Sequence, residues 1–309
     1  MSKATISVII PTQRRPQGLA VAAQSILRQQ GVAADRLELV VVDNDRTPSA
    51  APLAAELAAQ APFPVHYVHE PEPGVANARN AAMAQASGDL IAFLDDDEEA
   101  PEHWLATLLE VQARLQADVV FGPVRGRAPP QVTRHRDYLE TFFSRLGPDE
   151  AGLIENYYGC GNSLLRRAAL PDPIAPFSAV RNHTGGEDDL LFGGLKAAGA
   201  RFAWAAEAFV WEDPVPARLS LGYTIRRAFA YGQGPSAACA AAQPPAYLGL
   251  AYWMSQGVVQ AAVFGLLAAW KGVTGAPDFA FTLDRAARGL GKTLWWGPFK
   301  IEFYGRSAA

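Results

Sequence analysis

The first 124 residues alternate short apolar, β-branched segments with segments in which apolar residues recur every three or four positions. Between the apolar segments, helical spacing predicts one helix that begins after Pro16 and ends near Gly31, and another over 101–116. Strands that alternate with helices indicate an α/β fold with a mostly parallel, Rossmann-like sheet flanked by helices. The expected strands are 5–11, 37–43, 64–69, 89–95 and 118–124.

The pattern changes between residues 125 and 160, where Pro and Arg residues predict loops or a lid over a site. Regular structure is expected to resume with NSLLRRAAL (162–170), followed by a helix that opens at GGEDDLL (185–191). A strand is expected within RFAWAAEAFVWED (201–213), followed by a helix around LGYTIRRAFAYG (221–232).

A long uncharged segment follows. Residues 228–270 contain no Asp, Glu, Lys, Arg or His, and 246–270 is long enough to cross a hydrocarbon core as a helix. Short positive tails tend to remain cytoplasmic, so a segment that lies in the membrane surface or re-enters it fits better than a single crossing. The alternative is a buried helix packed on the catalytic domain. The basic residues beyond the segment are Lys271, Arg285, Arg288, Lys292, Lys300 and Arg306.

We therefore expect two regions, a catalytic domain over 1–235 and a hydrophobic or amphipathic membrane-associated region over 236–309. The expected location is the cytoplasmic face of a membrane, with peripheral or monotopic attachment. The Trp295 and Trp296 pair suits the headgroup level, where amphipathic rings lie.

Composition narrows the function. The chain has 309 residues, half of them hydrophobic, which allows a large core. A net charge of −4 offers no basic excess for nucleic-acid phosphates, so no nucleic-acid partner is expected. Two cysteines without a paired motif argue against a disulfide framework or a structural zinc and favour a reducing compartment. Because the strand-like TISVII begins directly after Lys3, we expect no cleaved export signal.

The most specific chemical signal is FLDDDEE at 93–99, a carboxylate cluster after an apolar strand. If the strand continues through the cluster, Asp95 and Asp97 point to one side and Asp96 to the other. Converging carboxylates suit Mg²⁺ or Mn²⁺, and such an ion stabilises the charge on a leaving diphosphate. The alternative is a solvated acidic turn that caps the helix at Pro101.

A second acidic group, Glu187 to Asp189, opens a helix after two glycines. Transfer of a sugar to a hydroxyl requires a carboxylate base within hydrogen-bond reach of that hydroxyl, and one of these acids could serve. Capping of the helix is the alternative, because a helix amino terminus favours negative charge.

Two further motifs could contact a nucleotide. VVVDND ends a strand at Asp43 and Asp45, and HEPEPGVANARN leads through Gly74 into a helix that carries Arg79 near its start. A helix amino terminus with an Arg beside it is an anion site. A turn acid and a helix-surface Arg are the alternatives.

VIIPTQRR, VVVDND, GVANARN, FLDDDEE and GGEDDLL, in this order and spacing, resemble glycosyltransferase family two. The resemblance extends to bacterial exopolysaccharide β-1,4-glucosyltransferases of succinoglycan type, supported by FGPVRG (121–126), EAFVWEDPVP (207–216) and the closing KIEFYG (300–305).

The resemblance implies a GT-A fold in which Thr12, Asp43 and Arg79 hold the uridine and phosphates of a UDP-sugar. Asp95 and Asp97 would hold the diphosphate and its divalent metal. Asp188 would be the catalytic base, with Glu187 beside it at the substrate. The expected reaction is inverting transfer of a hexose, with glucose favoured, to a lipid-linked oligosaccharide, and the resemblance implies that it takes place at the cytoplasmic face of the inner membrane. Further substrate phosphates would be met by Arg226 and Arg227.

One position departs from the family. Relatives often place a metal-binding His after the last core strand, where this chain has Trp211, so either Glu212 or Asp213 substitutes or water completes the metal shell. A non-catalytic nucleotide-sugar-binding or scaffolding protein is the main alternative function. A nucleotidyltransferase remains possible on fold grounds alone, although only Arg14 and Arg15 represent the Gly-rich basic loop typical of such enzymes. A dinucleotide oxidoreductase is excluded because G-x-G-x-x-G does not follow the first strand.

Overall fold

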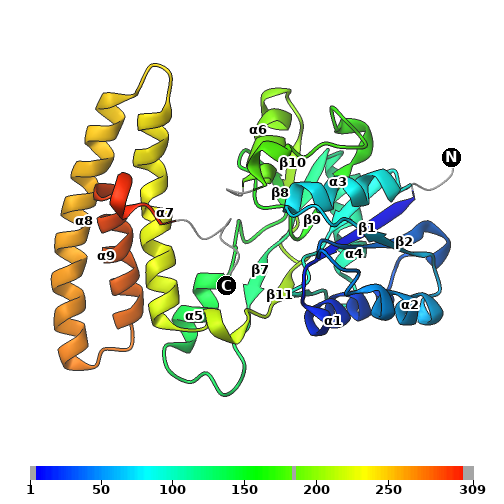
Figure 1. Cartoon of the computed structure of the whole chain (residues 1–309), viewed down its shortest axis with the longest axis horizontal. Helices are drawn as coiled ribbons and strands as arrows, with labels where there is room; N and C mark the ends of the chain where they lie inside the picture. The colour runs from blue at the N-terminus through cyan, green and yellow to red at the C-terminus, as the bar shows by residue number, and fades with distance from the viewer. Residues whose placement is uncertain (1–4, 183–185, 302–309) are drawn as a thin grey trace. The chain divides into compact units, whose positions relative to one another are not determined.

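The computed structural model describes residues 5–182 and 186–301, and Figure 1 shows the arrangement of its helices and strands. The chain forms two compact units. The first comprises the described residues up to Arg125 together with those between Ser144 and Asp213. The second comprises Gly126–Phe143 and the described residues from Pro214 onward.

An eight-stranded sheet forms the centre of the first unit, in the order β3-β2-β1-β4-β9-β6-β10-β8. The four strands from β3 to β4 are parallel to one another, whereas β9 is antiparallel to both of its neighbours. The strands are β1 (Ile6–Thr12), β2 (Leu37–Asp43), β3 (Val65–His69), β4 (Leu90–Phe93), β6 (Val119–Phe121), β8 (Gly152–Ile154), β9 (Ser163–Arg166) and β10 (Phe202–Trp204).

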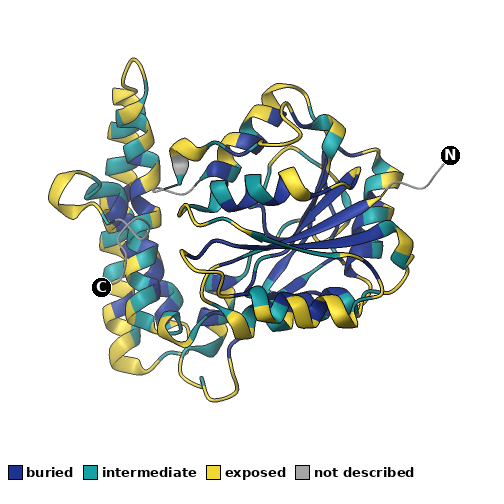
Figure 2. Cartoon of the chain, turned by 45° about the vertical axis from the view of Figure 1, so that its right-hand side comes forward, coloured by how far each residue is buried: buried dark blue, intermediate teal, exposed yellow. Residues whose placement is uncertain are grey.

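Helices cover both faces of this sheet, and Figure 2 shows its strands buried between them. Because successive strand side chains point to opposite faces, β1 sends Val8 into one apolar cluster and Ile9 into the other. The first cluster packs against α1 (Pro16–Leu27), α2 (Ala51–Gln60) and α4 (Trp104–Leu115), and the second against α3 (Val75–Gln85) and α6 (Glu187–Ala197).

A small second sheet has the strand order β5 (Glu98–Glu99), β11 (Val210–Glu212), β7 (Val124–Gly126). In its antiparallel register, Glu212 lies opposite Glu98. Short 3₁₀ turns lie at Ala34–Arg36, Arg167–Ala169, Ala179–Arg181, Pro216–Arg218 and Gly297–Phe299.

The second unit is helical. It contains α5 (Arg136–Phe143), α7 (Leu221–Ala241), α8 (Tyr247–Thr274) and α9 (Phe279–Thr293). Glycines let α9 approach its neighbours closely: a Cβ on Gly289 would lie 2.6 Å from Ala261 N of α8. Beyond α9, the aromatic side chains of Trp296 and Phe299 lie edge to face.

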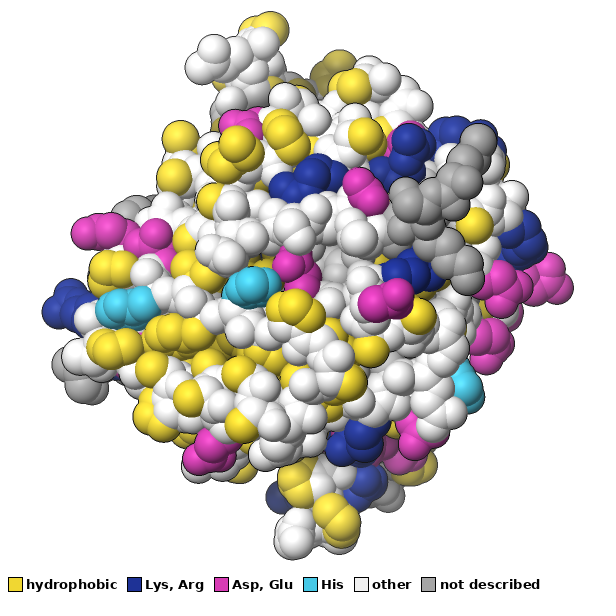
Figure 3. All heavy atoms as spheres, turned by 90° about the vertical axis from the view of Figure 1, so that its right-hand side faces the viewer, with side chains coloured by type: hydrophobic (Ala, Val, Ile, Leu, Met, Phe, Trp, Pro, Cys, Tyr) yellow, Lys and Arg dark blue, Asp and Glu magenta, His cyan; other side chains and the backbone are white. Residues whose placement is uncertain are grey.

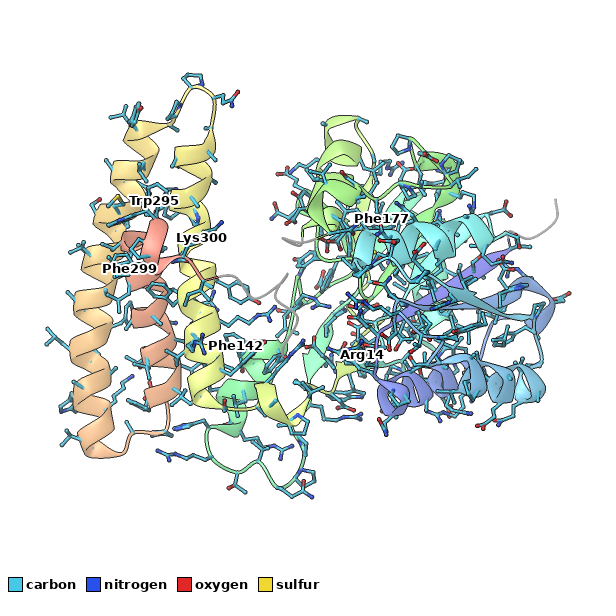
Figure 4. The ribbon with its side chains drawn as sticks, in the orientation of Figure 1. Arg14, Phe142, Phe177, Trp295, Phe299 and Lys300 are labelled. Carbon is cyan, nitrogen blue, oxygen red and sulfur yellow. The ribbon has the colours of Figure 1, made fainter. Side chains whose placement is uncertain are left out.

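Helix α5 belongs to this unit although it lies far from it in the sequence. Tyr138 donates its hydroxyl to the buried Asp284 of α9 (3.1 Å), and its ring packs edge to face on Phe281. Phe142, labelled in Figure 4, stacks on Tyr231 of α7. These contacts explain why Gly126–Phe143 clusters with the carboxy-terminal helices.

The fold class predicted from the sequence is confirmed, with local differences. The strand predicted at 118–124 is divided into β6 and β7, because Gly122 and Pro123 interrupt it and Pro lacks a backbone donor. The segment predicted as loops contains α5 and β8, and the strand predicted within 201–213 is two strands. The expected boundary at residue 235 falls inside α7, whereas the compact units divide at Asp213.

Helix α8 is 28 residues long and, of the described helices, the one long and apolar enough to cross a membrane by length and composition. Its apolar side chains are widely exposed, with Leu266 and Val273 at 76% and 89%. The other helices of the second unit therefore leave most of α8 uncovered.

Candidate active site

The predicted nucleotide and metal motifs meet at one edge of the large sheet. Strand β1 pairs with β2 on one side and β4 on the other, all parallel, so their carboxyl ends lie together. Thr12 ends β1, Asp43 ends β2, and the acidic segment follows β4. This is the edge at which open α/β sheets bind ligands.

The three aspartates after β4 do not alternate as predicted. The strand ends at Phe93 and the chain turns, with Glu98 N–H donating to Asp95 O (3.1 Å). Asp96 and Asp97 consequently meet the same group, Arg15 Nη1, at 2.8 and 2.7 Å. The prediction that Asp96 points away from Asp97 is therefore wrong.

Asp96 is buried and structural. Thr12 Oγ1 donates to its Oδ2 (2.8 Å), which fixes the end of β1 to the acidic turn. Burial raises the pKa of Asp96 to about 6, an effect that the charge of Arg15 and the hydrogen bond from Thr12 oppose. Thr12, predicted to contact the nucleotide, thus has a protein partner, and its contact with phosphate stays a prediction.

Arg79 joins the two acidic motifs. It is buried, donates through Nη1 to Glu187 Oε1, and places Nη2 3.6 Å from Asp95 Oδ1. Its guanidinium carbon lies 5.5 Å from the centre of the Phe177 ring (Figure 4). The alternative of a helix-surface arginine is therefore wrong. Burial raises the pKa of Glu187, and the Arg79 charge opposes that rise.

Asp188 faces a glycine-rich turn. Its Oδ2 accepts a hydrogen bond from the Cys160 peptide N–H (3.2 Å), and its Oδ1 accepts one from the Asp189 N–H (2.9 Å). Gly159 and Gly161 flank Cys160. A Cβ on Gly161 would lie 2.5 Å from Asp95 Oδ2, whereas one on Gly159 would lie 3.5 Å from Asp188 Oδ2. The same turn therefore touches the predicted base and the predicted metal ligand.

We expect Gly161→Ala to lower sugar transfer at least about tenfold, because the methyl group displaces the Asp95 carboxylate and every tenfold corresponds to only about 1.4 kcal/mol. Gly159→Ala is the matched control, since its Cβ meets only ordinary contact distances. Steady-state transfer rates and thermal melting of both variants measure the effect. Equal rates for the two variants would contradict this positioning of Asp95.

A second cluster of side-chain ion pairs supports the acidic turn. Glu98 is fully buried; its Oε2 accepts from the Asp95 N–H (2.9 Å) and its Oε1 pairs with Arg145 Nη2 (3.1 Å). Arg145 Nη1 also lies 3.6 Å from Glu212, the residue opposite Glu98 in the small sheet. Arg145 thereby offsets two facing like charges. Burial raises the pKa of Glu98 above its usual range.

Two carboxylates at this edge suit a divalent cation. The side chains of Asp95 and Asp97 keep 30% and 16% of their surface exposed. Mg²⁺ is commonly held by one or two carboxylates together with substrate phosphates and water. In the described part of the chain, no three His, Cys, Asp or Glu side chains group to hold an ion. The identity of the third ligand, whether Glu212, Asp213 or water, stays a prediction.

The end of β2 is built around Asp43, which is fully buried. Its Oδ2 accepts from Ala50 N–H (2.7 Å) and from the Tyr67 hydroxyl (3.0 Å). Nearby, Asp45 pairs with the exposed Arg14, which Figure 4 labels (Nη2 to Oδ1, 2.9 Å). Asp43 therefore organises the segment before α2, and its contact with uridine stays a prediction.

The remaining predicted substrate residues, Arg226 and Arg227, lie on α7 in the second unit. Arg227 donates to the hydroxyl groups of Tyr231 (2.6 Å) and Tyr223 (2.9 Å), and Arg226 is exposed. Their contact with substrate phosphates stays a prediction.

Comparison with known proteins decides the family. Residues 7–172 match the pattern described as "Glycosyl transferase family 2". The chain is also 38% identical over 229 residues to "Succinoglycan biosynthesis protein ExoM" of Rhizobium meliloti (strain 1021), covering 74% of this chain and 73% of that protein. The chain belongs to glycosyl transferase family 2. The family resemblance predicted from the five motifs is thereby confirmed.

Solved glycosyltransferases share the fold of this family 2 member. The mannosyltransferase PcManGT from Pyrobaculum calidifontis, in complex with GDP-Man and Mn²⁺, aligns with a TM-score of 0.58 and 22% identity, covering 96% of this chain and 88% of that structure. S. aureus TarS 1–349 in complex with UDP-GlcNAc aligns with a TM-score of 0.51 and 19% identity, covering 72% of this chain and 65% of that structure. The predicted GT-A fold is confirmed.

Sequence reasoning missed three contributors to the site: Arg15, the turn around Cys160, and Arg145. Arg15 follows β1 directly, and the glycines around Cys160 are a signal of close backbone approach. No local pattern marks Arg145, whose partners lie 47 and 67 positions away. On the face drawn in Figure 3, Lys and Arg side chains are interspersed with Asp and Glu side chains.

Proposed function

We propose that this family 2 enzyme transfers a hexose from a UDP-sugar to a lipid-linked saccharide, with inversion at the anomeric carbon. The observation that carries the proposal is the link through Arg79, which contacts Asp95 of the acidic turn and Glu187 of the α6 start. Asp188, the proposed base, follows Glu187 in the sequence, and Asp95 is a proposed ligand of the diphosphate and its metal. The ion pairs of Arg79 therefore support a single site that contains both groups.

In the proposed reaction, the Asp188 carboxylate accepts the proton of the acceptor hydroxyl as the hydroxyl oxygen attacks the anomeric carbon. The bond from that carbon to the diphosphate breaks with its electron pair going to the diphosphate. The peptide N–H groups of Cys160 and Asp189 hold the base in place. Asp95 and Asp97 would hold a divalent cation, which stabilises the charge on the leaving diphosphate.

Two similarities support the donor and acceptor classes. The relative from Rhizobium meliloti is named for succinoglycan biosynthesis, and the TarS structure holds UDP-GlcNAc. We propose an exopolysaccharide intermediate as the acceptor, in line with the first similarity, and glucose as the hexose, in line with the resemblance seen in the sequence motifs. The exposed, apolar α8 supports attachment to a membrane, which we propose to be the cytoplasmic face of the inner membrane.

The direct test is incubation of membranes that contain the enzyme with radiolabelled nucleotide sugars and lipid-linked acceptors. Transfer of one labelled hexose to the organic-soluble fraction, dependent on the UDP-sugar, is the expected result. If the purified chain binds UDP-sugars but transfers nothing to any acceptor, the function is that of a binding or scaffolding protein.

Membrane attachment makes a separate prediction. Leu266→Asp combined with Val273→Asp should shift the protein from the membrane fraction to the soluble fraction, because both side chains are exposed and a charge opposes burial in lipid. Leu146→Asp, on an exposed leucine of the first unit, is the matched control and should remain with membranes. Quantified fractionation of both variants measures this. Unchanged membrane binding of the double variant would rule out α8 as the attachment.

A further inference from the structure

Cationic side chains lie over aromatic rings along the α8–α9 pair. Lys292 Nζ of α9 lies 5.3 Å from the centre of the Trp253 ring of α8. Further along the same two helices, the guanidinium carbon of Arg285 (α9) lies 5.3 Å from the centre of the Phe264 ring (α8). Aromatic faces attract cations, and each guanidinium or ammonium group keeps donors for an outside partner.

The row continues to the end of α8. Lys271 donates to Thr282 of α9 (2.9 Å) and pairs with Asp278. Trp253, Phe264 and Lys271 are 11 and 7 positions apart, close to three and two turns of helix, so they lie on one side of α8. We call Lys292, Arg285 and Lys271 the cationic row.

An exposed apolar stripe runs along α8 beside this row. Successive helix side chains are rotated by about 100°, so Phe264 lies about a quarter turn from Val263 of the stripe, and Lys271 lies about a quarter turn from Trp270. The stripe keeps a spacing of three, four or seven positions and consists of Tyr252, Val259, Val263, Leu266, Trp270 and Val273. A polar row at the border of an apolar surface is the pattern of a helix at a lipid interface.

A recess of about 300 Å³ lies between the two helices at the end of the row. Lys271 and Arg285 contribute two positive charges to its lining and Asp278 one negative charge, which leaves a net positive charge. Leu267, also in the lining and 40% exposed, connects the recess to the apolar side of α8. The recess therefore combines a net positive lining with an apolar border.

We propose that the cationic row binds the headgroup phosphates of anionic bilayer phospholipids, with α8 lying in the plane of the membrane and one phosphate in the recess between Arg285 and Lys271. This inference rests on the membrane attachment proposed above and adds the lipid class and the orientation. An anionic phospholipid carries both groups that this surface can bind, a phosphate for the cationic row and acyl chains for the apolar stripe.

The length of the row favours this orientation. From Trp253 to Lys271, α8 rises about 27 Å at 1.5 Å per residue, close to the thickness of a hydrocarbon core of about 30 Å. A crossing helix would therefore place Arg285, which lies beside Phe264, deep in hydrocarbon. An in-plane helix keeps all three cations at the level of the phosphates.

The test is flotation of the full chain with vesicles of phosphatidylcholine alone or with about a third of phosphatidylglycerol. We expect stronger binding to the anionic vesicles, weakened by salt, and about a fivefold loss of that binding for Arg285→Gln or Lys292→Gln. Arg285→Lys retains the charge and should retain most of the binding. Arg114→Gln, on an exposed arginine of α4, is the matched control and should bind like the parent.

Equal binding to neutral and anionic vesicles would overturn the cationic row while leaving the proposed membrane attachment in place. Binding to neither kind of vesicle would overturn both. Circular dichroism shows whether Arg285→Gln lowers the melting temperature of the protein. If it does, the test rests on the salt dependence of vesicle binding by the parent and on the binding of the Arg285→Lys variant. Parent binding that does not change with salt would overturn the proposal. Sugar transfer assayed separately tests the catalytic function independently of these outcomes.

Discussion

Replacing Asp188 with Asn is expected to lower sugar transfer by a factor on the order of 10² to 10⁴ while UDP-sugar binding persists. The amide oxygen can still accept the hydrogen bond that Cys160 N–H donates to the carboxylate, whereas the amide NH2 replaces the oxygen that accepts from Asp189 N–H at the exposed start of the helix. What disappears is the capacity to take the acceptor's proton. Calorimetric affinity for the donor, measured beside single-turnover transfer, separates binding from chemistry.

Two neighbouring acids provide the controls. Asp189→Asn changes an exposed position of the same helix start and should have a much smaller effect. Glu187→Gln weakens the pair with Arg79, so it should lower transfer moderately and also destabilise the fold. If Asp188→Asn transfers sugar at the parent rate while Asp189→Asn does not, the base is Asp189 and the assignment of Asp188 is wrong.

Removal of the metal site is expected to abolish transfer. Asp95→Ala and Asp97→Ala each remove a predicted ligand, and excess EDTA removes the ion itself, so all three should eliminate the stabilisation of the leaving diphosphate. The measurement is transfer rate against added Mn²⁺ or Mg²⁺. Glu56→Ala, an exposed acid on α2, is the charge-matched control and should retain activity.

Full activity of the parent in excess EDTA would reject a metal-dependent mechanism. In that case a protein cation would have to take over the charge stabilisation, and Arg15, which contacts both Asp96 and Asp97, is placed at that turn. An Arg15→Gln variant assayed in EDTA would then lose activity.

The sequence predicted the layered part of the fold because its signals are local. Residues 37–43 are all apolar or β-branched except Glu38 and Asp43, and a strand buried on both faces reads as such a run. The helix start at Pro16 was confirmed for the same reason: Pro fits the first helical position. These features need no knowledge of distant residues.

Features that depend on distant partners could not be predicted in this way. Helix α5 has eight residues, too few to be stable alone, and it forms against aromatic and acidic groups of α7 and α9. The acidic turn was predicted as a strand end because the alternation rule was applied beyond Phe93. No local pattern predicts that Arg15 bridges Asp96 and Asp97 or that Arg79 bridges Asp95 and Glu187, since both contacts depend on tertiary approach.

The way in which the chain leaves and re-enters the first unit has a practical consequence for protein engineering. Val124 and Arg145 exchange both backbone hydrogen bonds, at 2.9 and 2.8 Å, so the two ends of the segment between them lie side by side. Deleting only the carboxy-terminal helices would strip Tyr138 of its partner Asp284 and leave the aromatic side of α5 uncovered. A soluble catalytic fragment therefore also requires removal of Gly126–Phe143, with a two-residue Asn-Gly turn that joins Arg125 to Ser144 in its place.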